Sequence, residues 1–178
     1  TAALGAAVIA GASSAVVAAP DRDRFVLGDT AVELWEGRGL HGAATEFYQV
    51  TIGDRTSGPR EARFELMLRD RTIDPLLDPQ PAIAPELAAD ADVNMWIVQY
   101  ETQPLDAYAD ALAASGATIR WFVPYQAAAV EMDAAAAAAV ADLPFVRWMG
   151  PLHPEYRIDG PVRDALLVDA LVPDEYNI

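Results

Sequence analysis

The chain has 178 residues and a mass of 19.1 kDa, enough for one ordinary domain or two small ones, and 53% of its residues are apolar. Its 27 acidic residues outnumber its 12 basic ones and give a net charge of -15, which argues against nucleic acids and anionic membrane surfaces as partners. Because cysteine is absent, disulfides, thiolate metal sites and a cysteine nucleophile are excluded.

Residues 1–19 form an uncharged run of small and apolar residues, which ends at Pro20 and a charged stretch. The small residues at 17–19 are typical of a signal-peptide cleavage site. Glycine, serine and alanine dominate the run, so it is a poor transmembrane span. Two predictions follow for the apolar N-terminal segment, residues 1–20: it is the remnant of a secretory signal, or it is an assembly segment buried against a neighbouring subunit.

Residues 21–73 contain four short runs that alternate in hydrophobicity or carry aromatic and β-branched residues. Turn signals, among them Gly28, Gly53 and the Ser57-Gly58-Pro59 stretch, separate these runs. We therefore predict a small antiparallel sheet with strands at 24–27, 31–35, 46–52 and 63–68. Residues 74–94 follow as a linker or extended strap, because four prolines between 74 and 85 prevent a helix or a central strand there.

Residues 95–157 have a clearer pattern, with strands predicted at 95–100, 117–122, 127–132 and 145–149. Helices are predicted at 104–115, where Gly116 ends the helix, and at 134–141, where Asp133 caps the N-terminus. This βαββαβ order predicts an α+β fold whose second part is ferredoxin-like: a four-stranded antiparallel sheet with both helices on one face. Residues 158–178 form a C-terminal extension, and residues 175–178 resemble the start of another strand like 96–100.

Several short pieces of sequence occur in a characteristic order and spacing between residues 66 and 157. They are Arg71-Thr72-Ile73-Asp74-Pro75, Trp96-Ile97-Val98-Gln99-Tyr100, Ala113-Ala114-Ser115-Gly116-Ala117, Val123-Pro124-Tyr125, Val130-Glu131-Met132-Asp133 and the run from Leu143 to Tyr156. Together they resemble the N-terminal prodomain of secreted subtilisin-like serine proteases. The resemblance implies a folding chaperone and temporary inhibitor of a catalytic domain, whose non-local contacts give it a high folding barrier.

The chain itself is not expected to be an enzyme. The Asp, His and Ser sequence contexts of the subtilisin-like triad are absent. The nearest approach, His41-Gly42-Ala43, lies upstream of the prodomain-like residues, where no triad residue belongs, so His41 is predicted to be a loop residue. We predict no catalytic residue and no cofactor.

One stretch has the spacing of a calcium-binding loop. Asp90, Asp92, Asn94 and Glu101 match its positions 1, 3, 5 and 12. However, Met95 occupies the position that requires glycine, and the residues after it read as a strand. We therefore predict a solvated linker here and no metal site.

Aromatic residues concentrate near the second and fourth strands of the 95–157 segment. Strand alternation places Trp121 and Phe122 on opposite faces, with Phe122 expected beneath the helices and the other aromatic on the open face as a docking surface. Glu131 is expected to point away from Val130 and Met132, and the resemblance implies that an acidic group there caps helix ends on the protease. The candidate protein-docking residues are Trp121, Tyr125, Glu131, Trp148 and Tyr156.

The sequence therefore predicts a non-catalytic prodomain segment of a secreted subtilisin-like protease, with the catalytic domain as its partner. The alternative is a structural subunit of an extracellular assembly or filament, in which identical subunits associate through residues 1–19. Both interpretations predict an extracellular protein without a nucleic-acid partner and without membrane association after processing.

Overall fold

The computed structural model describes residues 23–78, 83–90 and 92–167. The predictions for residues 1–20 and 175–178 concern parts of the chain outside these ranges. The described residues combine helices with antiparallel sheets, so the α+β class is confirmed. Among them, no helix has the length and apolar character needed to cross a membrane.

The first part of the described chain is an antiparallel sheet in which strands follow one another in the order β1-β2-β3-β4, with β5 also paired to β3. Its strands are β1 (Asp23–Leu27), β2 (Thr30–Arg38), β3 (Ala44–Ile52), β4 (Arg55–Thr56) and β5 (Arg60–Glu61). Gly28 and Gly53 adopt positive φ at the two tight turns, which favours glycine there. Val32 lies opposite Val50, and both are buried in a small cluster of their own.

The predicted strand at 63–68 is wrong in extent and in partner. Only β6 (Leu66–Met67) is a strand, and it pairs with β7 (Thr72–Ile73) in a separate hairpin. The physical reason is the burial of Leu66, which is 1% exposed and packs against the second sheet instead of the first. After this hairpin the chain passes through a 3-10 turn, η1 (Pro85–Leu87), before the second sheet begins.

The second sheet has the strand order β11-β8-β10-β9, and every neighbouring pair is antiparallel. In chain order its elements are β8 (Met95–Tyr100), α1 (Asp106–Ala114), β9 (Thr118–Val123), β10 (Ala127–Glu131), α2 (Ala134–Ala141) and β11 (Val146–Pro151). These elements agree with the predicted strands and helices to within about two residues at each end, the usual uncertainty of such boundaries.

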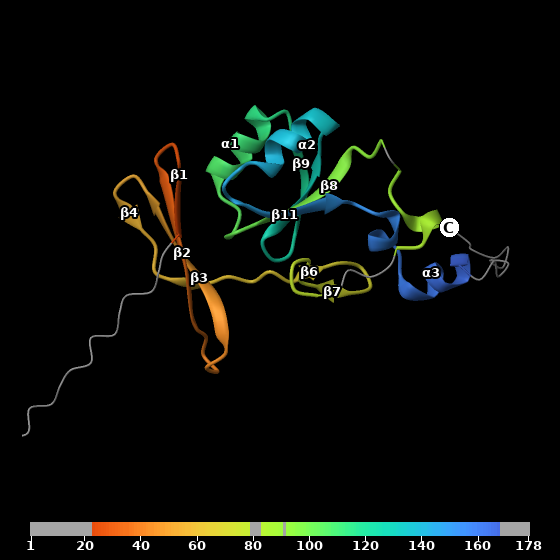
Figure 1. Ribbon diagram of the computed structural model, residues 1–178, viewed down its shortest axis with the longest axis horizontal. Coiled ribbons are helices and arrows are strands. Elements are labelled where there is room, and N and C mark those ends of the chain that lie inside the picture. Colours follow the sequence, from red (N-terminus) through yellow and green to blue (C-terminus); the bar gives the residue numbers. More distant parts are fainter. Residues whose placement is uncertain (1–22, 79–82, 91, 168–178) are drawn as a thin grey trace, which may run out of the picture.

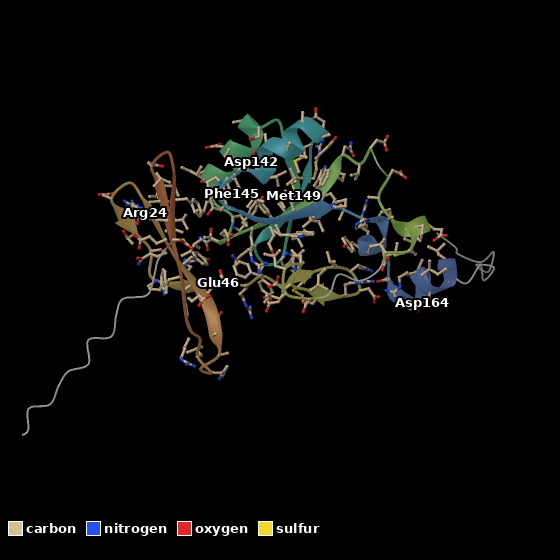
Figure 2. The ribbon with its side chains drawn as sticks, in the orientation of Figure 1. Arg24, Glu46, Asp142, Phe145, Met149 and Asp164 are labelled. Atoms are coloured by element: carbon tan, nitrogen blue, oxygen red, sulfur yellow. The ribbon has the colours of Figure 1, made fainter. Side chains whose placement is uncertain are left out.

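Both helices pack on the same face of this sheet (Figure 1). Val98 and Val130 from the strands, Leu112 from α1 and Val140 from α2 are fully buried together there. Phe145 and Met149 lie in the same layer (Figure 2). The alanine-rich α2 can approach the sheet closely because its buried side chains are short.

The helix ends follow from local chemistry. The Asp133 carboxylate accepts a hydrogen bond from the backbone N–H of Ala136 at 2.8 Å, which confirms the predicted cap of α2. Gly116 follows α1 with a φ of 85°, a conformation that ends a helix and favours glycine.

The face opposite the helices is covered by the chain itself. The β6–β7 hairpin and a second 3-10 turn, η2 (Pro154–Arg157), lie on this face (Figure 1). Their side chains Leu66, Ile73 and Tyr156 form one buried cluster with Ile97 and Ala127 of the sheet. The expectation of an open face is therefore wrong for the centre of the sheet, because apolar residues outside the βαββαβ unit bury it.

A short helix, α3 (Gly160–Leu167), follows η2 and contacts the hairpin turn. Arg163 pairs with Asp70 at 2.9 Å, and Arg69 pairs with Asp159 at 2.6 Å. A Cβ atom at Gly160 would lie 2.8 Å from an Asp70 carboxylate oxygen. Glycine, which has no Cβ atom, therefore allows the Asp70 side chain to approach the α3 backbone this closely.

A buried ion pair connects β11 to the segment after β7. The Arg147 guanidinium donates to both carboxylate oxygens of Asp74, at 2.9 and 3.1 Å, and to the Gln99 carbonyl oxygen at 2.7 Å. It also lies 3.8 Å from the centre of the Phe64 ring. The Arg147 and Asp74 side chains are only 7% and 13% exposed, so each charge depends on the other for compensation.

Replacing Arg147 is expected to destabilise the protein strongly. Arg147→Leu leaves the Asp74 carboxylate buried without its cation, and we expect a loss of about 3 kcal/mol in the free energy of unfolding by urea titration. Adding Asp74→Asn should recover part of this loss, because the uncompensated charge is removed. Arg69→Leu removes the cation of an exposed pair with Asp159 and is the matched control. It should change the free energy of unfolding little. Equal losses of stability for Arg147→Leu and Arg69→Leu would contradict the conclusion that burial makes the Arg147–Asp74 pair essential.

Candidate protein-docking site

The five predicted docking residues fall into three groups. Trp121 and Tyr125 are on the surface, with 43% and 44% of their area exposed. Trp148 is half-buried and Tyr156 is buried, and both contribute to the cluster beneath the hairpin. Glu131 is half-exposed and forms an ion pair with Arg120. Trp121 and Tyr125 therefore remain available for docking, whereas Trp148 and Tyr156 stabilise the fold.

Trp121 lies on β9, which is an edge strand of the second sheet. Within the described residues β9 pairs only with β10. The register places Trp121 opposite Ala129 and Ile119 opposite Val130, so Arg120 is the extra residue of a bulge. From the bulge, Arg120 reaches across to Glu131, the end of β10.

Phe122 is more exposed than predicted, at 59% of its area. It lies on the helix side of the sheet, where it borders a small cavity with Leu105 and Tyr108. The expectation that Phe122 fills the core is wrong, because this position is on the edge strand and the packing of α1 reaches it only in part. Trp121 and Phe122 consequently present aromatic surface on both sides of the same strand.

A cleft of about 710 Å³ borders Trp121 on the face opposite the helices. It lies between the β6–β7 hairpin and the β9 margin of the sheet, which are joined at one end by a hydrogen bond from the Met67 N–H to the Pro124 carbonyl at 3.2 Å. Its walls are largely apolar and include Ile97, Val123, Leu152 and Tyr156. The cleft is therefore shaped by side chains from four separate segments, and no single stretch of sequence indicates it.

Two arginines border the exposed aromatic residues. The Arg63 guanidinium lies 4.4 Å from the centre of the Tyr125 ring, and that of Arg157 lies 6.0 Å from the centre of the Trp121 rings. Both arginines are exposed, and neither forms an ion pair with a carboxylate of the described residues. Sequence reasoning missed them, because each is far from its aromatic partner along the chain. We call Trp121, Phe122, Tyr125, Arg63 and Arg157 the aromatic–arginine margin.

Comparison with known proteins adds a family match without a function. The sequence model of a family described as a domain of unknown function, DUF8729, matches residues 67–153. The matched stretch starts in β6 and contains β7, the strap and the complete βαββαβ unit. No curated protein and no solved structure matches the chain.

A second feature is the acidic junction between the two sheets. A cavity of about 500 Å³ there is lined by Glu36, Glu46, Glu65, Asp74, Asp78 and Arg147, among other residues. Glu46 is on β3 (Figure 2). The nearby Glu101 carboxyl is half-buried, and its pKa is raised to about 7 by burial first and then by the negative charge of Glu46. Asp23 raises it further, and Arg147 opposes the shift.

Among the described residues, no three His, Cys, Asp or Glu side chains gather closely enough to hold a metal ion. The calcium-like spacing is interrupted by β8: Asn94 precedes this strand and Glu101 follows it, so the two lie at opposite ends. His153 has a structural role instead. Its Nδ1 atom accepts a hydrogen bond from the backbone N–H of Ala89 at 2.9 Å, and burial lowers its pKa.

The raised pKa of Glu101 predicts a pH-dependent stability. The folded state retains the Glu101 proton up to about pH 7, whereas the ordinary value for the unfolded chain is 4.5. This contribution to stability is therefore complete below pH 4.5 and is lost as the pH rises through 7. Glu101→Gln should raise the free energy of unfolding at pH 8 by about 1 kcal/mol, allowing for solvent screening, and by much less at pH 4.

Urea titrations of the wild-type chain and the variant at both pH values measure this effect. Glu86→Gln, at an exposed position in η1, is the control for loss of a negative charge. If Glu101→Gln raised the free energy of unfolding equally at pH 4 and pH 8, the proposed ionisation of Glu101 would be contradicted.

Proposed function

We propose that this chain is a non-catalytic prodomain-type segment of a secreted subtilisin-like serine protease, and that it acts as folding chaperone and inhibitor of the catalytic domain. The supporting observation is the strand order β11-β8-β10-β9 with α1 and α2 on one face. Numbered along the βαββαβ unit, this order is 4-1-3-2, the arrangement of a ferredoxin-like fold. The proposal includes this finer fold assignment, which the sequence resemblance implies.

A prodomain of this kind works by offering a preformed surface to a chain that folds slowly. The catalytic domain has a parallel sheet with non-local contacts, so a template that binds its native-like surface lowers the folding barrier. The same binding energy inhibits the finished enzyme for as long as the complex persists. In this protein the helix layer and the buried cluster around Tyr108 and Phe145, whose rings stack at 4.1 Å, provide the rigidity that a template needs.

The docking surface in this proposal is the aromatic–arginine margin and not the centre of the sheet. Leu66, Ile73 and Tyr156 already cover the centre. Trp121 and Tyr125 keep nearly half of their surface accessible and have the residue types that contribute most at protein interfaces. A catalytic domain would therefore contact the sheet along β9 and the β9–β10 turn.

The test is inhibition and refolding of the cognate protease, identified by reading the gene past the codon for Ile178. The purified chain should inhibit the active enzyme at nanomolar concentration or accelerate recovery of activity after denaturation. Joint replacement Trp121→Ala and Tyr125→Ala should weaken inhibition by about tenfold or more. Leu40→Ala, at a residue that is 97% exposed in another loop, should have no effect. A folded chain that neither inhibits nor assists refolding would contradict the proposal.

The second candidate function is that of an extracellular assembly subunit, motivated by the uncharged run at residues 1–19. It predicts concentration-dependent oligomers, measured by sedimentation velocity, that disappear when residues 1–19 are deleted. The prodomain proposal predicts instead that deletion leaves inhibition unchanged. A chain that stays monomeric with and without these residues would eliminate the assembly subunit.

A further inference from the structure

We propose that the outer edge of β9 binds an extended segment of another protein, in which one or two carboxylates alternate with apolar side chains, as a fifth strand of the sheet. This inference goes beyond the proposed function, because it concerns the chemistry that this edge recognises and does not require the partner to be a protease. It rests on the edge strand, the side chains on its two faces and the charges beside it.

The two edges of the second sheet differ in how they are covered. β11, at one edge, has no exposed residue along its six positions. β9, at the other edge, exposes Thr118, Arg120, Trp121 and Phe122, and no strand of the described residues pairs with its outer side. A six-residue edge strand with exposed aromatic side chains is a template for another strand. The charged bulge at Arg120 protects one part of this edge and leaves Trp121 and Phe122 exposed.

Side chains on both faces of β9 are placed to contact an added strand. Trp121 projects to the side of the cleft and Phe122 to the side of the helices. Successive side chains of an added strand would also alternate between these two faces. Apolar side chains on the helix side would meet Phe122 and Leu105, whereas carboxylates on the cleft side would lie beside Trp121 and Arg157.

The charges beside this edge select the partner. The chain carries a net charge of -15, yet the guanidinium groups of Arg63 and Arg157 stand over exposed aromatic rings without a carboxylate partner among the described residues. A segment with one or two carboxylates would neutralise them. A second copy of this chain is disfavoured, because it would bring together two molecules with the same large negative charge.

The experiment uses two synthetic ten-residue peptides, blocked at both ends, as probes of the full chain. One alternates valine and glutamate, and the other alternates valine and lysine. Amide signals assigned by NMR, with hydrogen exchange, report which strand the peptide contacts, and fluorescence anisotropy of labelled peptides gives the affinity. The glutamate peptide should perturb and protect amides of β9, and the lysine peptide should bind at least about tenfold more weakly.

Variants at the edge and at matched distant positions complete the test. Trp121→Ala should weaken binding of the glutamate peptide by about tenfold, and Arg157→Gln by about threefold. Arg38→Gln and Leu40→Ala change an exposed arginine and an exposed apolar residue away from β9, and should leave the affinity unchanged. Circular dichroism confirms that each variant is folded.

Three results would overturn the inference: no change at β9 amides with the glutamate peptide at millimolar concentration, equal affinity for both peptides, or association of the chain with itself through β9. None of these experiments uses a protease. The inference can therefore fail while inhibition of a protease is observed, and it can hold where no inhibition is found.

Discussion

The buried Arg147–Asp74 pair is the constraint on which the arrangement of the layers depends. Arg147 belongs to β11, whereas Asp74 follows the β6–β7 hairpin, and the same guanidinium lies over Phe64 just before that hairpin. Each hairpin strand has only two residues, too few to be stable alone. The charge pair and the burial of Leu66 and Ile73 together hold the hairpin on the sheet. Removing the cation would leave a buried carboxylate at the centre of this contact.

This contact changes what the second sheet can offer to a partner. A βαββαβ unit with helices on one side would leave its other side free for docking. Here the hairpin and η2 occupy that side, and the match to DUF8729 begins within the hairpin. The exposed aromatic residues lie instead at the β9 edge and the β9–β10 turn, where Trp121 and Tyr125 adjoin two arginines, and we propose this margin as the docking surface. The acidic junction around Glu101 is a separate feature, in which burial and the charge of Glu46 raise the pKa of the Glu101 carboxyl.

Most of the second sheet could be predicted from the sequence because its signals are local. A short run of aromatic and β-branched residues indicated β8, Asp133 capped α2, and Gly116 ended α1. Val130 of β10 and Met132 just after it are buried in the same cluster, as strand alternation predicts. The candidate docking site was predicted only in part: Trp121 and Tyr125 are exposed, whereas Trp148 and Tyr156 belong to a buried cluster. The sequence does not distinguish a core aromatic residue from an interface aromatic residue, because the difference depends on neighbours that are distant along the chain.

The sequence by itself determined the α+β class, the order of the elements between residues 95 and 151 and the approximate ends of their two helices, since each depends on residues within a few positions of one another. It also determined the strong net negative charge. Only the tertiary structure decided that Leu66 pairs away from the first sheet, that Tyr156 closes the face opposite the helices, and that Arg63 and Arg157 reach the exposed aromatic rings. These contacts join segments far apart in the chain. Their free energy comes from burial and charge pairing across layers, which leave no periodic pattern in the sequence.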